Sequence, residues 1–488
     1  MKLNKTSLII AGVVALVSMQ SCKKYLEKAP DNRAEINTVD KLSQLVGTAY
    51  PSADYLTFTE YSSDNVEDKG VGIGSTNEAI DLPYNWEDVV GDGTNTSTSY
   101  WNGCYGAIAA ANQALEAIEQ QNFGAAALPY KGEALVARAY AHFMLVTLFA
   151  KTYEPGGANT SPGIPYVLAP ETKVIQPYSR GTVQSTYDLI QKDLEEGLPL
   201  LATSAYKVPK YHFTPQAAHA FAARFYLFKG EWQKVIDHAT LTVSGNDFVS
   251  NLRPISTSLR TATLEEHRTN FMSSAQRYNL LLVNNYSTYA RWTSPRHGFG
   301  NKLVTMFAAG NNVTGKALAN TSPSYGIPHF TTYKHKEFFF NTGPGIGFPY
   351  LSYSILTVDE ALMNRAEAYA ELGQDALALK GLNDFYSVRI VNYSPTGDAI
   401  TTAKLATYFP GTTTKEALIK AVLEAKKSQF LQEGLRWFDV LRRKITVVHN
   451  NFDITGLETF AELKPEDPRR VFQLPQEVKL SGVELNPR

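Results

Sequence analysis

Two stretches that lie far apart in this chain repeat one helix–glycine–helix pattern, and this feature constrains the fold most. The first, AARFYLFKGEWQKVIDHA, ends at Ala239, and the second, RAEAYAELGQDALALKGLND, ends at Asp384. Alignment on Gly230 and Gly373 brings small and aromatic residues of the two stretches to matching positions. A glycine that ends a helix can turn the chain into an antiparallel partner. Because a helix pair cannot bury its apolar face alone, the chain is predicted to contain stacked, tetratricopeptide-like helix pairs.

Other segments have helical signals of their own. Residues 133–149 are apolar nearly all round, as expected of a buried helix. Thr182 precedes an amphipathic segment over 184–201, and Thr214 with Pro215 begins another over 215–228. Threonine before a helix and proline in its first turn are common start signals. These patterns predict a mostly α-helical protein.

The helical regions are separated by a long segment of different composition. Helix pairs are predicted within roughly 101–245 and 355–443, and the segment between them, roughly 245–350, is rich in Asn, Ser, Thr, Gly and aromatic residues. A connection of this length inside a helical frame is usually functional or partly structured. We therefore predict a large, irregular, loop-rich insertion on one side of a single domain that spans residues 22–488.

The N-terminus has the features of a secretory signal. Lys2 and Lys5 precede an unbroken apolar run from Leu8 to Val17, which is too short to span a bilayer. Cys22 directly follows the small residue Ser21, which predicts a lipoprotein signal peptide over residues 1–21 and lipidation of Cys22. Two alternatives remain: an ordinary signal with an incidental cysteine, or a Cys22–Cys104 disulfide.

Charge and motifs exclude several function classes. The formal net charge is −1, without the basic excess that a nucleic-acid-binding protein needs. The sequence has no HExxH zinc helix, no GxSxG elbow and no P-loop. We therefore predict a protein that is not an enzyme and that needs no metal or cofactor.

Recognisable sequence pieces are spaced along almost the whole length of the chain. They are Cys22 with Tyr25, Leu26 and Pro30; YSSDN with Asp64; WNGCYGAIAAANQAL from Trp101; GEALVARAYAHFMLVTLFA from Gly132 to Ala150; TYDLIQKDLEEGLPLL from Thr186; FTPQAAHAFAARFYLFKGEW from Phe213; VDEALMNRAEAYAELG from Val358; FLQEGLRWFDVLRR ending at Arg443; LPQE at Leu474; and the NPR tail. These pieces resemble those of the SusD/RagB family of Bacteroidetes outer-membrane nutrient-binding lipoproteins, and they occur in the family's order.

This resemblance implies a fold, a location and a partner. The fold would be a right-handed superhelical scaffold of tetratricopeptide-like pairs, with loops on one side forming a ligand surface. The protein would be anchored by lipid in the outer membrane, exposed at the cell surface, and would pass oligosaccharides to a SusC-type TonB-dependent transporter. In the RagB branch the ligand would be a peptide.

Aromatic side chains on two loop segments are the candidate ligand contacts. A sugar ring has an apolar face that stacks on exposed Trp or Tyr, and hydroxyls that Asn, Asp, Gln and Arg can bind. Such residues are expected on loops held by a rigid scaffold. The candidates are Trp292, Tyr289, Tyr286 and Arg291 from residues 284–296, and Trp86, Tyr84 and Asn85 from residues 84–88. The alternative is that these aromatics form local loop core.

The GLRWFD motif at residues 434–439 is interpreted as structural. Arg436 and Asp439 have the i,i+3 spacing of an ion pair on a helix. Trp437 and Phe438 would then pack against a neighbouring helix. Asp64 is a candidate for ligand or cation binding, but a role in a turn is favoured.

Two other functions remain alternatives to nutrient binding. A helical surface glycoside hydrolase would need two essential carboxylates. A scaffold protein would use its helix pairs for protein contacts and bind no small ligand. Stacked helices suit both a binding protein and a scaffold, so the repeats do not separate them.

Overall fold

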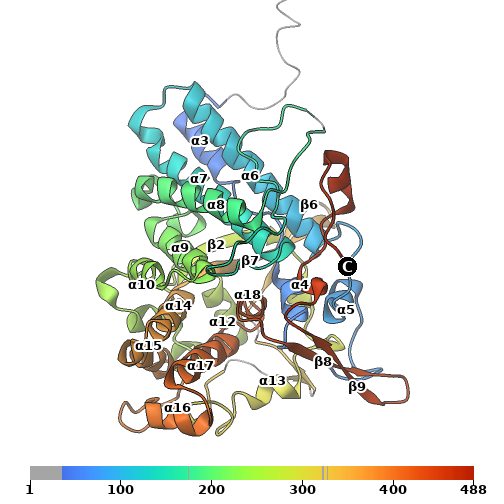
Figure 1. The fold of residues 1–488 in the computed structure, drawn as a ribbon, viewed down its shortest axis with the longest axis vertical. Coiled ribbons are helices and arrows are strands. Elements are labelled where there is room, and N and C mark those ends of the chain that lie inside the picture. The colour runs from blue at the N-terminus through green and yellow to red at the C-terminus, as the bar shows by residue number, and fades with distance from the viewer. Residues whose placement is uncertain (1–35, 174, 321–323, 327, 333) are drawn as a thin grey trace, which may run out of the picture.

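The computed structural model describes residues 36–173, 175–320, 324–326, 328–332 and 334–488, and these residues fold mainly into α-helices (Figure 1). The predicted signal peptide and Cys22 lie outside the described residues, so the structure does not test them. The helices of the first half are α3 (Val39–Val46), α4 (Leu56–Tyr61), α5 (Glu78–Tyr84), α6 (Ser97–Gln120), α7 (Leu128–Phe149), α8 (Val183–Gly197), α9 (Pro215–Lys229) and α10 (Trp232–Thr240). Those of the second half are α11 (Ser258–Thr261), α12 (Leu264–Phe271), α13 (Asn301–Thr305), α14 (Val358–Glu371), α15 (Asp375–Ser387), α16 (Thr402–Tyr408), α17 (Thr414–Gln429) and α18 (Arg436–Arg442).

The mostly α-helical fold class and the predicted helix starts are confirmed. The Thr182 side chain accepts a hydrogen bond from Ser185 N at the start of α8, and Thr214 does the same for Ala217 N at the start of α9. Gly230 ends α9 in the left-handed conformation, with φ of 70°, and Gly373 follows α14 with the same φ. Each glycine leads into the next helix of a pair, α10 or α15.

The two helix pairs pack directly on each other although the long insertion separates them in sequence. Helices α9 and α10 both contact α14. Arg224 of α9 reaches across to Glu360 of α14 with a bidentate ion pair of 2.6 and 2.5 Å. Both side chains are buried, so the pair fixes how one repeat sits on the other. Helix α17 then continues the stack beside α14 and α15.

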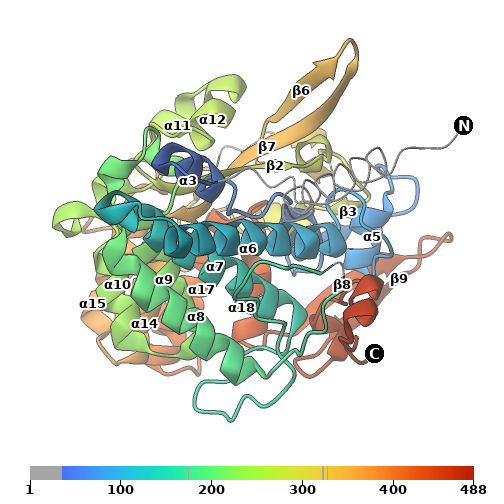
Figure 2. The same ribbon diagram turned by 90° about the horizontal axis from the view of Figure 1, so that it is seen from above.

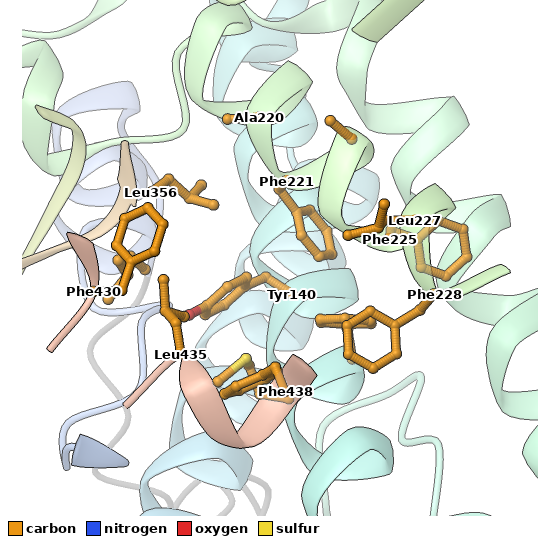
Figure 3. Close-up of a cluster of buried hydrophobic side chains, with 14 of the residues drawn as sticks. Tyr140, Ala220, Phe221, Phe225, Leu227, Phe228, Leu356, Phe430, Leu435 and Phe438 are labelled. Atoms are coloured by element: carbon orange, nitrogen blue, oxygen red, sulfur yellow. The ribbon is translucent and has the colours of Figure 1, made fainter. Parts of the chain in front are cut away.

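The all-apolar segment forms the centre of the core, as predicted. Helix α7 is buried along nearly its whole length and lies between α6 and α8. Its Tyr140 meets Phe221 of α9 edge-on, with ring centroids 5.3 Å apart, inside the cluster that also contains Phe228 and Phe438 (Figure 3). Helices from both halves of the chain therefore share one hydrophobic core.

The insertion is more ordered than its composition predicted, because part of it forms a sheet. The strands of the described chain are β1 (Glu67–Asp68), β2 (Asn279–Tyr286), β3 (His297–Gly298), β4 (Ser324–Gly326), β5 (His329–Phe330), β6 (Glu337–Gly343), β7 (Ile346–Thr357), β8 (Val447–Phe452) and β9 (Glu458–Leu463), and those from β2 to β7 begin within the insertion. Strands β2, β7 and β6 pair antiparallel in that order. Loop-like composition concealed this sheet because β2 contains three asparagines and because Gly and Ser residues interrupt the apolar ones of β7.

Two hairpins project from the helical body. Figure 2 shows the end of the β6–β7 hairpin extending beyond the helices, next to α12, and the β8–β9 hairpin extending from another side. Within the described part of the chain, no helix is both long and apolar enough to cross a membrane.

The GLRWFD motif is buried and structural in its contacts, but the predicted pairing of Arg436 with Asp439 is wrong. Arg436 instead binds Asp64 at 2.7 Å, and Asp439 binds Lys426 and Arg442, each at 2.7 Å. Burial would raise the pKa of Asp64, but the charges of Arg436 and Lys427 hold it well below its usual range. Asp64 thus serves as an anchor for the motif across 372 residues of sequence.

Candidate functional site

One face of the β2–β7–β6 sheet is rich in aromatic side chains. The strand register places Tyr286 opposite Tyr350 and Tyr350 opposite Phe338, so three rings cross the sheet in a row. Phe340 and Phe348 form a second cross-strand pair on the same face, because side chains two residues apart point the same way. These five residues, Tyr286, Phe338, Phe340, Phe348 and Tyr350, are called the aromatic face below.

A hollow of about 820 Å³, called the polar groove below, lies where β2 meets α6 and the segment after α3. Its lining includes the rings of Tyr286, Tyr350 and Tyr211 and the polar side chains of Ser52, Asp92, Ser99, Asn102 and Asn284. The side chains of Asn102 and Asn284 make no hydrogen bond to any other described residue. Their amides therefore remain available to a ligand.

Buried polar residues on either side hold Tyr286 in place. Asn285 donates to Ala53 O at 2.8 Å and to the Tyr353 hydroxyl at 3.0 Å, while Tyr286 N donates to Ser52 O at 3.2 Å. On the other side, Asn95 Nδ2 donates to Ser287 Oγ at 3.2 Å. A ring whose neighbours are locked in this way loses little conformational entropy on binding a ligand.

Asn95 joins the three segments that meet below the groove. It is buried in the left-handed conformation with φ of 70°, which asparagine tolerates better than most residues. It donates to Thr57 Oγ1 at 2.8 Å and accepts from Thr288 N at 3.0 Å. It also contacts Asp54, whose pKa is raised to about 6 by burial.

A second hollow of about 770 Å³, called the aromatic groove below, lies between the sheet and the end of α12. Its lining includes Phe338 and Phe340 from β6 and Met272 from the end of α12. It shares Tyr211, Asn284 and Tyr350 with the polar groove. The two hollows are therefore adjacent parts of one surface that runs along the sheet.

The structure brings only one of the sequence-predicted contacts, Tyr286, into these grooves with its ring exposed. The expectation of exposed rings is wrong for Tyr84 and Trp86. Tyr84 stacks between His297 and His449, with centroids 4.1 and 4.2 Å away, and Trp86 stacks on His449 and donates to Ser62 O. The β8–β9 hairpin supplies His449, so a distant segment turns this loop into core.

The remaining predicted residues also lie outside the lining of the two grooves. Tyr289 is buried beside His335, another correction to its predicted exposure, and Trp292 is half-buried against the core. Exposed Arg291 is held by Glu337 through a bidentate ion pair. Asn85 caps α5 and donates to Asp81 O. Whether any of these residues touches a ligand stays a prediction.

Sequence reasoning missed Tyr350 and Tyr211. A signal was present for Tyr350, because the alternation in 346–353 (IGFPYLSY) is typical of a strand with one aromatic side. Nothing local marked Tyr211, which reaches the site only because the short turn Pro209–Tyr211 packs beside β2.

The chemistry of the polar groove suits binding better than catalysis. Asp92 is the only carboxylate among the described residues that line it, whereas glycosidases use a pair. In the described part of the chain, no group of three His, Cys, Asp or Glu residues is placed to hold a metal ion. The other functional groups of the lining are aromatic rings, side-chain amides and the hydroxyls of Thr48, Ser52 and Ser99.

Comparison with known proteins agrees with the architecture. Residues 24–227 match the SusD-like family model described as starch-binding and associating with the outer membrane. No curated protein matches the chain. A SusD superfamily protein from Bacteroides thetaiotaomicron superposes with a TM-score of 0.65 at 19% identity, covering 92% of this chain and 100% of that one.

Two further structures come from Bacteroides vulgatus. A SusD superfamily protein has a TM-score of 0.67 at 20% identity and covers 93% of this chain and 99% of its own. A SusD-like carbohydrate binding protein has a TM-score of 0.65 at 14% identity and covers 91% and 97%. Residues 24–227 therefore carry the sequence pattern of the SusD-like family, and the fold of these solved SusD superfamily structures is shared over more than nine-tenths of the chain.

Proposed function

We propose that this protein is an outer-membrane lipoprotein that binds oligosaccharide in the polar groove and delivers it, without catalysis, to a SusC-type TonB-dependent transporter. The observation that carries the proposal is the combination, in a groove of about 820 Å³, of the Tyr211, Tyr286 and Tyr350 rings with the amides of Asn102 and Asn284, which bond to no other described residue. Tyrosine faces stack on the apolar face of a sugar ring, and amides bind its hydroxyls. The starch-binding, outer-membrane description of the matching family supports the same ligand class and location.

The stacking tyrosines are the sharpest test of this proposal. In a screen of oligosaccharides and peptides against the chain from residue 23, we expect a glycan to bind without being cleaved. Tyr286→Ala and Tyr350→Ala should each weaken that binding about tenfold to a hundredfold, because a stacking contact contributes roughly 1–3 kcal/mol. Calorimetry would measure the affinity, and chromatography of the ligand would detect cleavage.

Two control variants make this test specific. Tyr408→Ala removes a half-buried ring on α16, away from the groove, and should leave the affinity unchanged. Trp292→Ala tests the sequence-based prediction that this ring contacts the ligand, although the ring does not line the groove. Unchanged affinity in both Tyr286→Ala and Tyr350→Ala would exclude the polar groove as the binding site. Cleavage of the ligand would favour the glycoside hydrolase. Binding of peptides alone would favour the RagB-type function, and capture of a barrel partner without binding of any ligand would favour the scaffold.

The lipid anchor gives a separate prediction. Cys22→Ala should move the protein from the outer-membrane fraction to the soluble fraction, because acyl chains on Cys22 would supply the membrane affinity. Ser21→Ala keeps a small residue before the cysteine and should stay in the membrane. Immunoblots of the fractions measure the distribution. Membrane retention of the Cys22 variant would contradict lipid anchoring at this residue.

A further inference from the structure

The aromatic face of the sheet is too apolar for a surface that stays in contact with water. An antiparallel sheet with one side in solvent is normally polar on that side. Here Phe338, Phe348 and Phe340 are 47%, 48% and 64% exposed. Contiguous exposed apolar surface usually marks a binding site. The aromatic face is therefore expected to be covered in the working protein.

The position of this apolar surface ties it to the ligand of the polar groove. The aromatic groove shares Tyr211, Asn284 and Tyr350 with the polar groove, so one molecule can occupy both hollows. Polar side chains such as Ser273 and Lys336 line part of the aromatic groove, but its phenylalanines have no hydrogen-bonding group. An unmodified sugar ring can stack only its apolar face on Phe338 or Phe340 and would hold its fringe of hydroxyls beside apolar rings. The part of the ligand that lies against these phenylalanines is therefore expected to be more apolar than a sugar ring.

The lining further distinguishes a flat group from a flexible chain. The apolar residues of its lining are Phe338, Phe339, Phe340, Tyr211, Tyr350 and Met272, whereas no Leu, Ile or Val is found among the described residues that line the hollow. The face is also partly ordered by ring contacts, with Phe340 and Tyr286 edge-on to neighbouring rings. Aromatic groups favour offset-stacked or edge-to-face contacts with such rings.

We infer that the ligand is a glycan that carries an aromatic substituent, with its sugar in the polar groove and its aryl group in the aromatic groove. This inference rests on the proposed function and adds a substrate class to it. Aryl esters and aryl glycosides have the required chemistry: a hydroxyl-rich chain joined to one flat apolar ring. Tyr350 lies at the junction, where it can contact both parts.

The test compares matched forms of the same sugars. Short xylo-, manno-, malto- and cello-oligosaccharides would be titrated into the chain from residue 23 as unmodified sugars, nitrophenyl glycosides and hexyl glycosides. We expect the nitrophenyl form of the bound sugar to bind about tenfold more tightly than the unmodified form, and more tightly than the hexyl form. The Phe338→Ala/Phe340→Ala double variant should abolish this gain and leave the affinity for the unmodified sugar unchanged.

A matched variant and a folding measurement keep the test decisive. Phe460→Ala removes a phenylalanine of the β8–β9 hairpin that is 67% exposed, close to the 64% of Phe340, and should retain the full gain. Circular dichroism and thermal unfolding of each variant verify that it is folded. Tyr286→Ala should weaken both sugar forms, because it lies in the polar groove.

The outcomes separate this inference from the proposed function. If unmodified sugars bind and the nitrophenyl form binds no better, the aryl inference is wrong while glycan binding stands. Tightest binding of the hexyl form would point to an acyl or lipid occupant and also overturn it. The aryl inference would also be overturned if the double variant lost capture of the transporter while its binding of the nitrophenyl glycoside stayed unchanged. If no sugar binds in any form, the proposed function fails, and this inference fails with it.

Discussion

Trp437→Ala is expected to lower the free energy of unfolding by about 3–5 kcal/mol. The Trp437 ring is fully buried, and its centroid lies 5.8 Å from that of Phe472. Its removal would leave a cavity between α18 and the C-terminal segment, because close-packed neighbours relax only partly. Urea unfolding followed by circular dichroism measures the change.

A matched tryptophan serves as the control. Trp232, at the start of α10, is only half-buried, so Trp232→Ala should cost much less. If Trp437→Ala keeps the stability of the parent chain and loses ligand affinity instead, the GLRWFD motif is part of a binding site. The structural interpretation of the motif would then be wrong.

Glu433→Gln is expected to destabilise the protein by about 3–5 kcal/mol at neutral pH. Glu433 receives a bidentate ion pair of 2.7 and 2.9 Å from Arg253 and a third contact of 2.6 Å from Lys334. All three side chains are buried. The neutral amide would deprive two buried cations of the carboxylate that both contact, and such a loss costs far more than that of a surface pair.

The pH dependence of this effect follows from the pKa of Glu433. Burial would raise that pKa, but the charges of Arg253 and Lys334 outweigh burial and lower it to about 2 from the ordinary 4.5. The folded state therefore binds the proton more weakly than the unfolded state does. The carboxylate contributes its stability above about pH 4.5 and loses it as the pH falls toward 2. The stability gap between parent and variant should narrow across this range.

An exposed pair of the same geometry provides the comparison. Arg291 and Glu337 also form a bidentate pair, but at the surface, so Glu337→Gln should cost less than about 1 kcal/mol. Urea unfolding of the three proteins at several pH values between about 2 and 7 measures both effects. A gap for Glu433→Gln that stays constant down to pH 2 would contradict the assignment to the carboxylate charge.

For the candidate site, sequence reasoning succeeded at one position and failed where distant segments meet. Tyr286 was predicted because it lies in an aromatic segment with asparagines, and it does line the polar groove. Tyr84 and Trp86 have the same local composition, yet His449 covers both. Whether an aromatic ring is exposed depends on which segment packs over it, and no local pattern encodes a partner more than 350 residues away.

The sequence by itself determined the helices and their ends, since caps such as Thr182 and Thr214 and turns such as Gly230 act through hydrogen bonds between near neighbours. The tertiary structure decided how these helices meet. Arg436 pairs with Asp64 rather than with nearby Asp439, because folding brings Asp64 beside it and gives Asp439 two other cations. The two grooves likewise exist only where β2, β7 and β6 from the insertion meet helices from the rest of the chain. Local interactions fix secondary structure, whereas a binding surface arises from contacts that close large loops of sequence.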